Sequence, residues 1–560
     1  MSQPPTNPPT GPTNPFSPDR AKGHGQQFPP YGQQPYGQQP YGEQPAYPPQ
    51  QPPFQPQQPG YPPAGGAFPL PGASTTPKRS KKVPILAAAG VVAAIALGGG
   101  AFAYTKLAST GSQPDTVIPA SAVGFARIDL DPSAGQKVAA VRFLDKIPAV
   151  KKAQESGGDP RESLWKAITK DDKDLSGVDY TTDIKPWLGS RAAVAMLAQA
   201  NAKGEPVAMV ALAVTDEGRA RESLASLLSR KRANTVDVSV RSGYAIFTEK
   251  SATSIVMSEI DKGSIASNPT YQSDVKALGD IGVASAWFDV GAMKAAAWFD
   301  KLAKNSSGTS VSSTAMDQLQ GRVLSAVRFD ANYLEVAGVS RGGLSKAIPP
   351  PGGEIATLPA DTVGAVSIAG LDELIKDNWA ALSSAIGPKQ IAQAESQYGI
   401  ALPDDLALML GRSLTISFPD QDWSMFSKNP KMGMKVVTTD GNRAQSLIDK
   451  TIEEQGGSGG MFNSRKDNTL FFATDQDYLD SLSQGGALGS SESFKLAVAD
   501  AGSAQTAFFV DIDKIEENYL ENISSSNEYK DALAAIRAVG FSIKTTGPGD
   551  GAFSLRVVAN

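Results

Sequence analysis

The chain has 560 residues, a net charge of −5, one histidine and no cysteine. The lack of cysteine excludes disulfides, thiolate nucleophiles and cysteine-ligated zinc. Because His24 is the only imidazole, the rest of the chain has no Ser-His-Asp triad and no histidine-ligated metal. Beyond residue 104, acidic residues outnumber basic ones by 55 to 46, which makes nucleic acid a poor partner.

Residues 1–82 form a tail rich in Pro, Gln, Gly and Tyr, with a five-residue repeat over 31–45. Aliphatic residues are scarce in it, so no core can offset the entropy of ordering the chain. Proline also blocks helices and sheet ladders. We therefore expect a disordered tail that is a solvated tether. The alternatives are a docking strip for aromatic-lined partners and a segment that self-associates through its tyrosines.

The run Val83–Tyr104 has no charged residue and directly follows the basic cluster Lys78–Lys82. About 20 apolar residues suffice for a helix to cross a bilayer, and flanking basic residues stay on the cytoplasmic side. A signal peptide is disfavoured because 82 residues precede the run. The sequence thus predicts a single-pass protein of the cell membrane with a cytoplasmic tail and an ectodomain outside. Small residues at every fourth position of this helix favour a homodimer: Gly90, Ala94 and Gly98.

Beyond the predicted helix the chain contains an internal repeat. Segments of the first part recur about 220 to 240 residues later with a similar order of apolar residues. The matched pairs are 117–124 with 357–364, 187–191 with 409–413, 206–216 with 430–440, 244–248 with 469–473, and 287–290 with 509–512. Between the two parts, Gly342–Gly353 holds a triple proline, typical of a stiff linker. We therefore predict ectodomain halves at 105–345 and 346–560.

Within each half, strand-length apolar runs alternate with helical stretches. In the first half we expect strands at 192–197, 207–214, 236–240, 244–248, 283–290, 322–330 and 333–340. Helices are expected at 217–229, 254–260, 271–278 and 292–302. Short turns between neighbouring strands favour antiparallel pairing. The predicted class is α+β: a duplicated ectodomain of two similar halves with mainly antiparallel sheets, behind one transmembrane helix and a disordered N-terminal tail.

Three features are typical of one protein family: the opening segment Val117–Leu130 and the repeated Leu-Gly and Phe-Asp-Val elements. Over most of residues 113–560 the chain resembles this uncharacterised actinobacterial envelope family, domain of unknown function 3352. The tail is similar to those of many streptomycete-type membrane proteins. The resemblance implies no assigned activity and therefore no catalytic residues.

Two pairs of acids stand at equivalent positions between a strand and a helix: Asp216 with Asp440, and Asp289 with Asp511. Paired acids can act as general acids or cation ligands. Asp is also a preferred helix N-cap, and a cap explains why both halves repeat it at such a junction. We therefore interpret these four residues as caps.

Two Ser-x-x-Lys spacings resemble those of acyl-transfer enzymes, at Ser163 with Lys166 and at Ser273 with Lys276. The companion Ser-Asp-Asn and Lys-Thr-Gly elements are absent, so both matches are expected to be accidental. All six tryptophans follow residue 104, where they either pack in the core or line a lipid or glycan groove: Trp165, Trp187, Trp287, Trp298, Trp379 and Trp423.

From these observations we predict no catalytic, cofactor-binding or metal-binding residues, and no cofactor. The predicted function is that of a non-enzymatic cell-envelope protein whose ectodomain binds a protein partner or a lipid-like or glycan ligand. The alternative is an envelope hydrolase with a Ser–Lys or two-carboxylate site, since such sites operate without histidine.

Overall fold

The computed structural model describes most of residues 111–560. Outside the described part are residues 1–110, 149, 151–158, 160, 163–164, 166–177, 232–235, 302–319, 344–351, 353, 424–429, 455–459, 521–529 and 531–532. The predicted tail and membrane-spanning run therefore lie outside it, as do Ser163, Lys166 and most of the proline linker.

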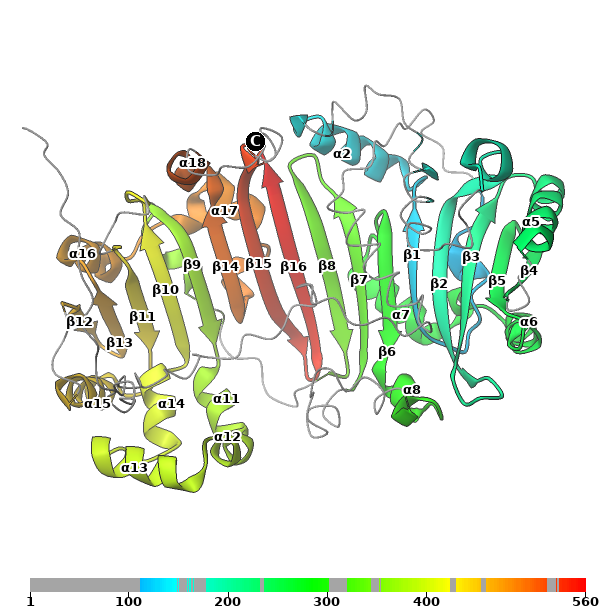
Figure 1. The fold of residues 1–560 in the computed structure, drawn as a ribbon. Helices are drawn as coiled ribbons and strands as arrows, with labels where there is room; N and C mark the ends of the chain where they lie inside the picture. The colour runs from blue at the N-terminus through cyan, green and yellow to red at the C-terminus, as the bar shows by residue number, and fades with distance from the viewer. Residues whose placement is uncertain are drawn as a thin grey trace, which may run out of the picture. The chain divides into compact units, whose positions relative to one another are not determined.

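The described residues build one antiparallel sheet of sixteen strands (Figure 1). The first eight strands are β1 (Ala122–Asp129), β2 (Leu188–Ala200), β3 (Pro206–Val214), β4 (Val236–Arg241), β5 (Tyr244–Glu249), β6 (Ala284–Asp289), β7 (Arg322–Phe329) and β8 (Tyr333–Arg341). The other eight are β9 (Thr362–Ala369), β10 (Ser413–Pro419), β11 (Gly433–Val437), β12 (Phe462–Lys466), β13 (Thr469–Ala473), β14 (Thr506–Asp511), β15 (Ile536–Gly547) and β16 (Asp550–Ala559).

The order of strands across the sheet is β12-β13-β11-β10-β9-β14-β15-β16-β8-β7-β6-β1-β2-β3-β5-β4. Read outward from the centre, β1–β8 and β9–β16 follow the same order. The centre is the ladder between β8 and β16, which runs from the pair Tyr333–Val558 to the pair Ser340–Gly551.

This ladder corrects the predicted fold class. We expected two halves with sheets of their own, behind one transmembrane helix. Instead, β8 and β16 hydrogen-bond directly, so the strands of both sequence halves belong to a single continuous sheet. In the described part of the chain, no helix combines the length and the apolar character needed to cross a membrane. The run that predicted such a helix, Val83–Tyr104, is outside that part.

Two hairpins at the outer ends of the sheet show how local sequence sets the turns. Ser242 and Gly243 join β4 to β5, both with positive φ (53° and 76°). Asp467, with φ of 53°, opens the corresponding turn between β12 and β13. Positive φ at the first central residue, here Ser242 or Asp467, matches the right-handed twist of paired strands. Gly243 and Asp467 are of residue types that tolerate it.

One face of the sheet is covered in both halves. In the first half it is covered by two one-turn helices, η1 (Pro114–Thr116) and η4 (Ile265–Ser267), and by two longer helices, α6 (Thr253–Lys262) and α7 (Pro269–Leu278). In the second half the corresponding elements are η5 (Ile355–Thr357), η6 (Leu488–Ser490), α16 (Gln476–Gln484) and α17 (Glu492–Ala497). We call this side the covered face. It holds the two largest clusters of buried apolar residues, around Phe125 and Trp287 and around Phe494 and Phe509.

The opposite face carries helices only over parts of its area. In the first half, α5 (Glu217–Lys231) with η3 (Tyr180–Ile184) and α2 (Ala134–Leu144) bury two patches of it. In the second half, α14 (Asp404–Leu410) and α15 (Gly441–Glu454) bury a third. Helix α8 (Val290–Ala295) also packs on this face, beside Met196 and Ala198. Helix α18 (Ile512–Leu520) contacts β15 and β9. The remaining helices are α11 (Leu371–Asp377), α12 (Trp379–Ile386) and α13 (Pro388–Tyr398), with the one-turn helix η7 (Ala501–Ser503).

Candidate functional site

The paired acids of the sequence are helix caps. The Oδ1 atom of Asp216 accepts a hydrogen bond from the amide of Arg219 at 3.0 Å, and that of Asp440 accepts one from the amide of Arg443 at 3.0 Å. Asp289 caps α8 in the same way, through the amide of Ala292 at 2.8 Å. Each carboxylate thus satisfies a free amide in the first turn of a helix, as the sequence interpretation expected.

Asp511 occupies the corresponding place between β14 and α18, but it is buried, with 4% of its surface exposed. Burial raises its pKa above the usual value, although the charge and the amide of Lys514 oppose this shift. Its Oδ1 atom has no hydrogen-bond partner among the described residues. Asp511 is therefore a cap whose ionisation lowers the free energy of unfolding.

The other residues considered as catalytic or groove-lining do not form a site in the described chain. Ser273 and Lys276 both lie exposed on α7. Trp187, Trp287 and Trp298 are at most 2% exposed, and their indole N–H groups donate to Asp183 O, Asp274 Oδ2 and Leu197 O. Three tryptophans are therefore core residues. Among the described residues, no group of three acidic or histidine side chains is placed to hold a metal ion.

Buried charges gather on the covered face, where sequence reasoning had not placed them. At the centre of the sheet, Glu335 of β8 accepts hydrogen bonds from Arg328, Ser554 and Arg556. Burial opposes the ionisation of Glu335, but these hydrogen bonds and the charge of Arg556 outweigh it, so its pKa lies below the usual value. Because Arg556 and Ser554 come from β16, this cluster fastens the two central strands to each other.

A second buried pair lies nearer β1, where Arg191 Nε stands 3.0 Å from Asp129 Oδ2. A third joins Asp274 of α7 to Arg322 of β7 at 2.9 Å. Each ion pair is partly or wholly removed from water and is satisfied by neighbours from other elements. We interpret these clusters as structural, because their charged groups form ion pairs with one another.

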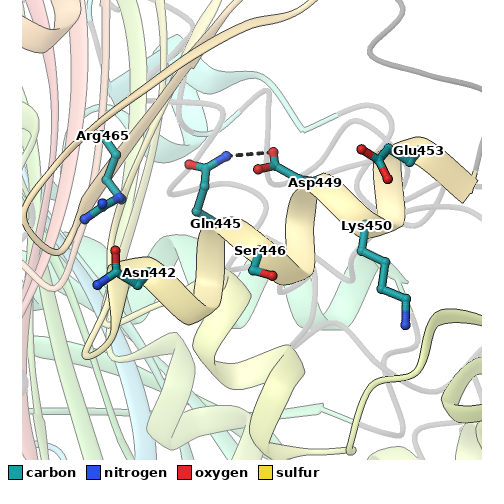
Figure 2. Close-up of a pocket in the computed structure, with 7 residues that line it drawn as sticks. All are labelled: Asn442, Gln445, Ser446, Asp449, Lys450, Glu453 and Arg465. Carbon is teal, nitrogen blue, oxygen red and sulfur yellow. Dashed lines mark hydrogen bonds between the residues drawn. The ribbon is translucent and has the colours of Figure 1, made fainter.

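A shallow polar hollow of about 420 Å³ runs along α15 (Figure 2). Seven polar side chains line it: Asn442, Gln445, Ser446, Asp449, Lys450, Glu453 and Arg465. Gln445 Nε2 donates to Asp449 Oδ1 at 2.7 Å, whereas Lys450 points away from Arg465 (Figure 2). The charged ends do not converge on one point, so the hollow offers no defined set of ligand contacts.

The most unusual surface of the sheet is on β9 and β10, on the side that faces away from the covered face. In an antiparallel sheet with one face open, the open side normally carries polar residues. Here the buried positions are the hydroxyl residues Ser367, Thr415 and Ser417, which are at most 1% exposed. Ser367 and Thr415 share a hydrogen bond of 2.8 Å, and Ser417 accepts one from the Tyr478 hydroxyl at 2.8 Å. The polar and apolar sides of β10 are thus reversed, whereas the buried side of β9 also holds Ala365 and Ala369.

Large apolar residues take the side that is open. Directly opposed residues in a sheet project from the same face, so the register defines rows of neighbours across strands. One row is apolar across fifteen strands, from β13 to β4: Phe472, Met434, Ile416, Val366, Phe508, Phe541, Leu555, Val336, Val327, Ala284, Ile128, Ala192, Leu212, Ala245 and Val240. Its outer parts are buried by α5, α2 and the α14–α15 pair.

The middle of this row, over β10, β9, β14, β15, β16 and β8, is not buried. Together with the rows on either side it forms a patch that we call the open apolar face. Its three rows are Phe418, Gly364, Val510, Val539, Val557 and Leu334; Ile416, Val366, Phe508, Phe541, Leu555 and Val336; and Leu414, Ile368, Thr506, Ile543, Phe553 and Gly338. Phe508 and Ile543 are each 40% exposed, and all the others except Gly338 are half-buried.

None of these eighteen described positions carries a charged side chain, and Thr506 is the one polar residue in the three rows. Such a continuous exposed apolar patch is uncommon on a protein surface and marks a contact site. Sequence reasoning missed it because alternation along one strand does not reveal which side is covered. The strands of both halves contribute to it, since β8 adjoins β16.

Residues 85–262 match a family described as Protein of unknown function (DUF3352). The described part of that segment runs from η1 to α6 and includes β1–β5. No curated protein and no solved structure matches the chain. The chain is therefore similar, over residues 85–262, to a family whose domain has no assigned function.

Proposed function

We propose that this chain is a non-enzymatic binding protein and that the open apolar face is its binding surface. The observation that carries the proposal is the reversed alternation of β10, which places Leu414, Ile416 and Phe418 toward the open side and hydroxyl residues inside. Exposing such residues costs free energy in water, about 25 cal/mol for each Å² of apolar surface. An occupant that covers them recovers that free energy.

The chemistry of the face supports a neutral, apolar occupant. Charged side chains of the same strands, among them Glu335 and Arg556, project toward the covered face. A charged or hydroxyl-rich occupant would be desolvated on the open face without gaining hydrogen-bond partners, which is unfavourable. The proposal thus selects the lipid-like class among the ligands that the sequence left open, over a glycan.

A non-catalytic role is supported by what the described acids and Ser273 do. Asp216, Asp289 and Asp440 are occupied as caps, and Ser273 is exposed on helix α7. The location at a cell membrane and the actinobacterial source remain predictions from the sequence and its resemblance. The homodimer through Gly90, Ala94 and Gly98 also remains a prediction, because these residues are outside the described part.

The test is the binding of an environment-sensitive hydrophobic dye to the full chain. We expect saturable binding that falls at least tenfold in Phe508→Ser and Phe541→Ser, because each change removes an aromatic ring from the middle row. Leu382→Ser, which alters another apolar residue, 39% exposed on α12, is the matched control and should leave binding unchanged. Equal dye binding by all four proteins would refute the proposed surface.

A further inference from the structure

We infer that the occupant of the open apolar face is a single acyl chain, which lies along the middle row across the strands. This inference rests on the proposed function and specifies its ligand. Four observations support it: the length of the row, its closed ends, the lack of hydrogen-bonding groups and the flat position of Phe553 beside the row.

The open row is long enough to hold an extended hydrocarbon chain. The row crosses six strands from Ile416 to Val336. With neighbouring strands about 4.8 Å apart, five spacings give roughly 24 Å. One leaflet of acyl chains fills about 15 Å, half of the bilayer core. A single chain therefore fits along the row without leaving it.

Both ends of the row enter buried core. At one end Val336 packs against the α2 cluster, which includes Phe143 and Val327. At the other end the row continues to Met434, which with Leu414 packs against the α14–α15 cluster. The open stretch is therefore bounded by helices on two sides, which gives a ligand on it a defined maximal length.

The face offers almost nothing to a polar partner. The six strands use their backbone N–H and C=O groups in ladders on both sides, so no strand of a partner can pair with them. A docked protein surface would bring polar groups that need new hydrogen bonds, and in the described rows only Thr506 has a side chain able to make one. An acyl chain has no such groups along its length.

Glycine keeps part of the floor flat. The ring of Phe553 lies over Gly338, where an added Cβ would come within 2.2 Å of the ring carbon Cε1. The ring thus takes the place of the missing side chain and lies against the sheet. The ring of Phe553 therefore does not rise beside a chain that lies along the neighbouring middle row.

The experiment is displacement of the bound dye from the full chain by saturated fatty acids of increasing length, below their micellar concentrations. We expect affinity to rise with each added methylene, by up to about fourfold, and to level off once the chain reaches the length of the open row. Ile416→Lys places a charge at the β10 end. It should shift the plateau to shorter chains, an effect that simple loss of stability would not produce. Leu382→Ser again serves as the control.

Three outcomes are informative. Length-dependent displacement with a plateau that moves in Ile416→Lys supports the inference. If the dye binds at Phe508 and Phe541 but no fatty acid displaces it, the acyl-chain inference is overturned and the proposed function still holds. Recovery of the protein on phosphatidylcholine vesicles in flotation, without displacement by monomeric fatty acid, would also overturn it, because the occupant would then be a bilayer surface.

Discussion

Phe508 and Phe541 stand directly opposite each other on β14 and β15, on the side of the sheet opposite the covered face. Their sequence neighbours Phe509 and Gly540 form the next pair and face the covered side, where Phe509 is fully buried. The adjacent residues Phe508 and Phe509 therefore have different roles, one in binding and one in the core.

Replacing each phenylalanine by alanine separates stability from binding. Phe509→Ala should lower the free energy of unfolding by about 3–5 kcal/mol, because it leaves a cavity beside Phe494. Phe508→Ala removes a ring that is 40% exposed and should cost less than about 1 kcal/mol while it abolishes dye binding. Urea denaturation of both variants checks this. A large loss of stability in Phe508→Ala would mean that its ring belongs to the core.

The stability of the ladder between β8 and β16 should depend on Glu335. Glu335→Gln leaves Arg328 and Arg556 with an uncompensated positive charge, and loss of one partner of a buried ion pair costs about 3–5 kcal/mol. The folded-state pKa of Glu335 is below the ordinary 4.5, so its contribution is present above pH 4.5 and is lost as the pH falls through the folded-state pKa.

The stability difference between wild type and Glu335→Gln should thus be constant above about pH 5 and shrink in acid. Denaturant titrations at a series of pH values measure it. Glu354→Gln is a control, because Glu354 pairs with Lys435 at a half-exposed position away from the centre. A difference that persists unchanged to pH 2 would contradict the assigned ionisation.

Asp511 predicts the opposite dependence on pH. Burial raises its folded-state pKa above 3.8, so folding favours the protonated form and stability is lost as the pH rises from 3.8 through the raised pKa. Asp511→Asn keeps a side chain that caps equally well and cannot ionise. The variant should be more stable than wild type at pH 7 and no more stable at pH 3, as measured by thermal unfolding at both pH values. A variant less stable at pH 7 would show that the carboxylate is needed in its ionised form.

The caps at Asp216 and Asp440 should behave alike. Each Asp→Ala change removes one hydrogen bond to a first-turn amide and should cost about 1 kcal/mol. Neither change should alter dye binding, since α5 and α15 lie outside the open apolar face. Loss of binding without loss of stability in either variant would reinstate these acids as ligand contacts.

Local patterns in the sequence were sufficient to predict many elements. The strands expected at 192–197 and 207–214 lie within β2 and β3, and the helix expected at 271–278 lies within α7. The helix expected at 292–302 is shorter: α8 ends at Ala295, and Ala296 is buried with Trp298 instead. Helical periodicity could not reveal this, because the tertiary environment of Trp298 outweighs the local preference.

The continuous sheet and the open apolar face could not be predicted in this way. Pairing of β8 with β16 joins residues more than 200 positions apart, such as Glu335 and Arg556, and alternation within a strand carries no information on its partner. The reversal at β10 has a related cause. Serine and threonine are mostly exposed in proteins, but the hydroxyls of Ser367 and Thr415 satisfy each other, so both residues can be buried.

The most direct test of the central claim is photocrosslinking of a diazirine-bearing fatty acid to the full chain, followed by mass spectrometry of the peptides. The account predicts crosslinks on β14, β15 and β16, at Phe508, Phe541, Ile543 and Phe553, that unlabelled fatty acid competes away. Crosslinks on α12 around Leu382, or on the covered side of the sheet instead, would contradict it.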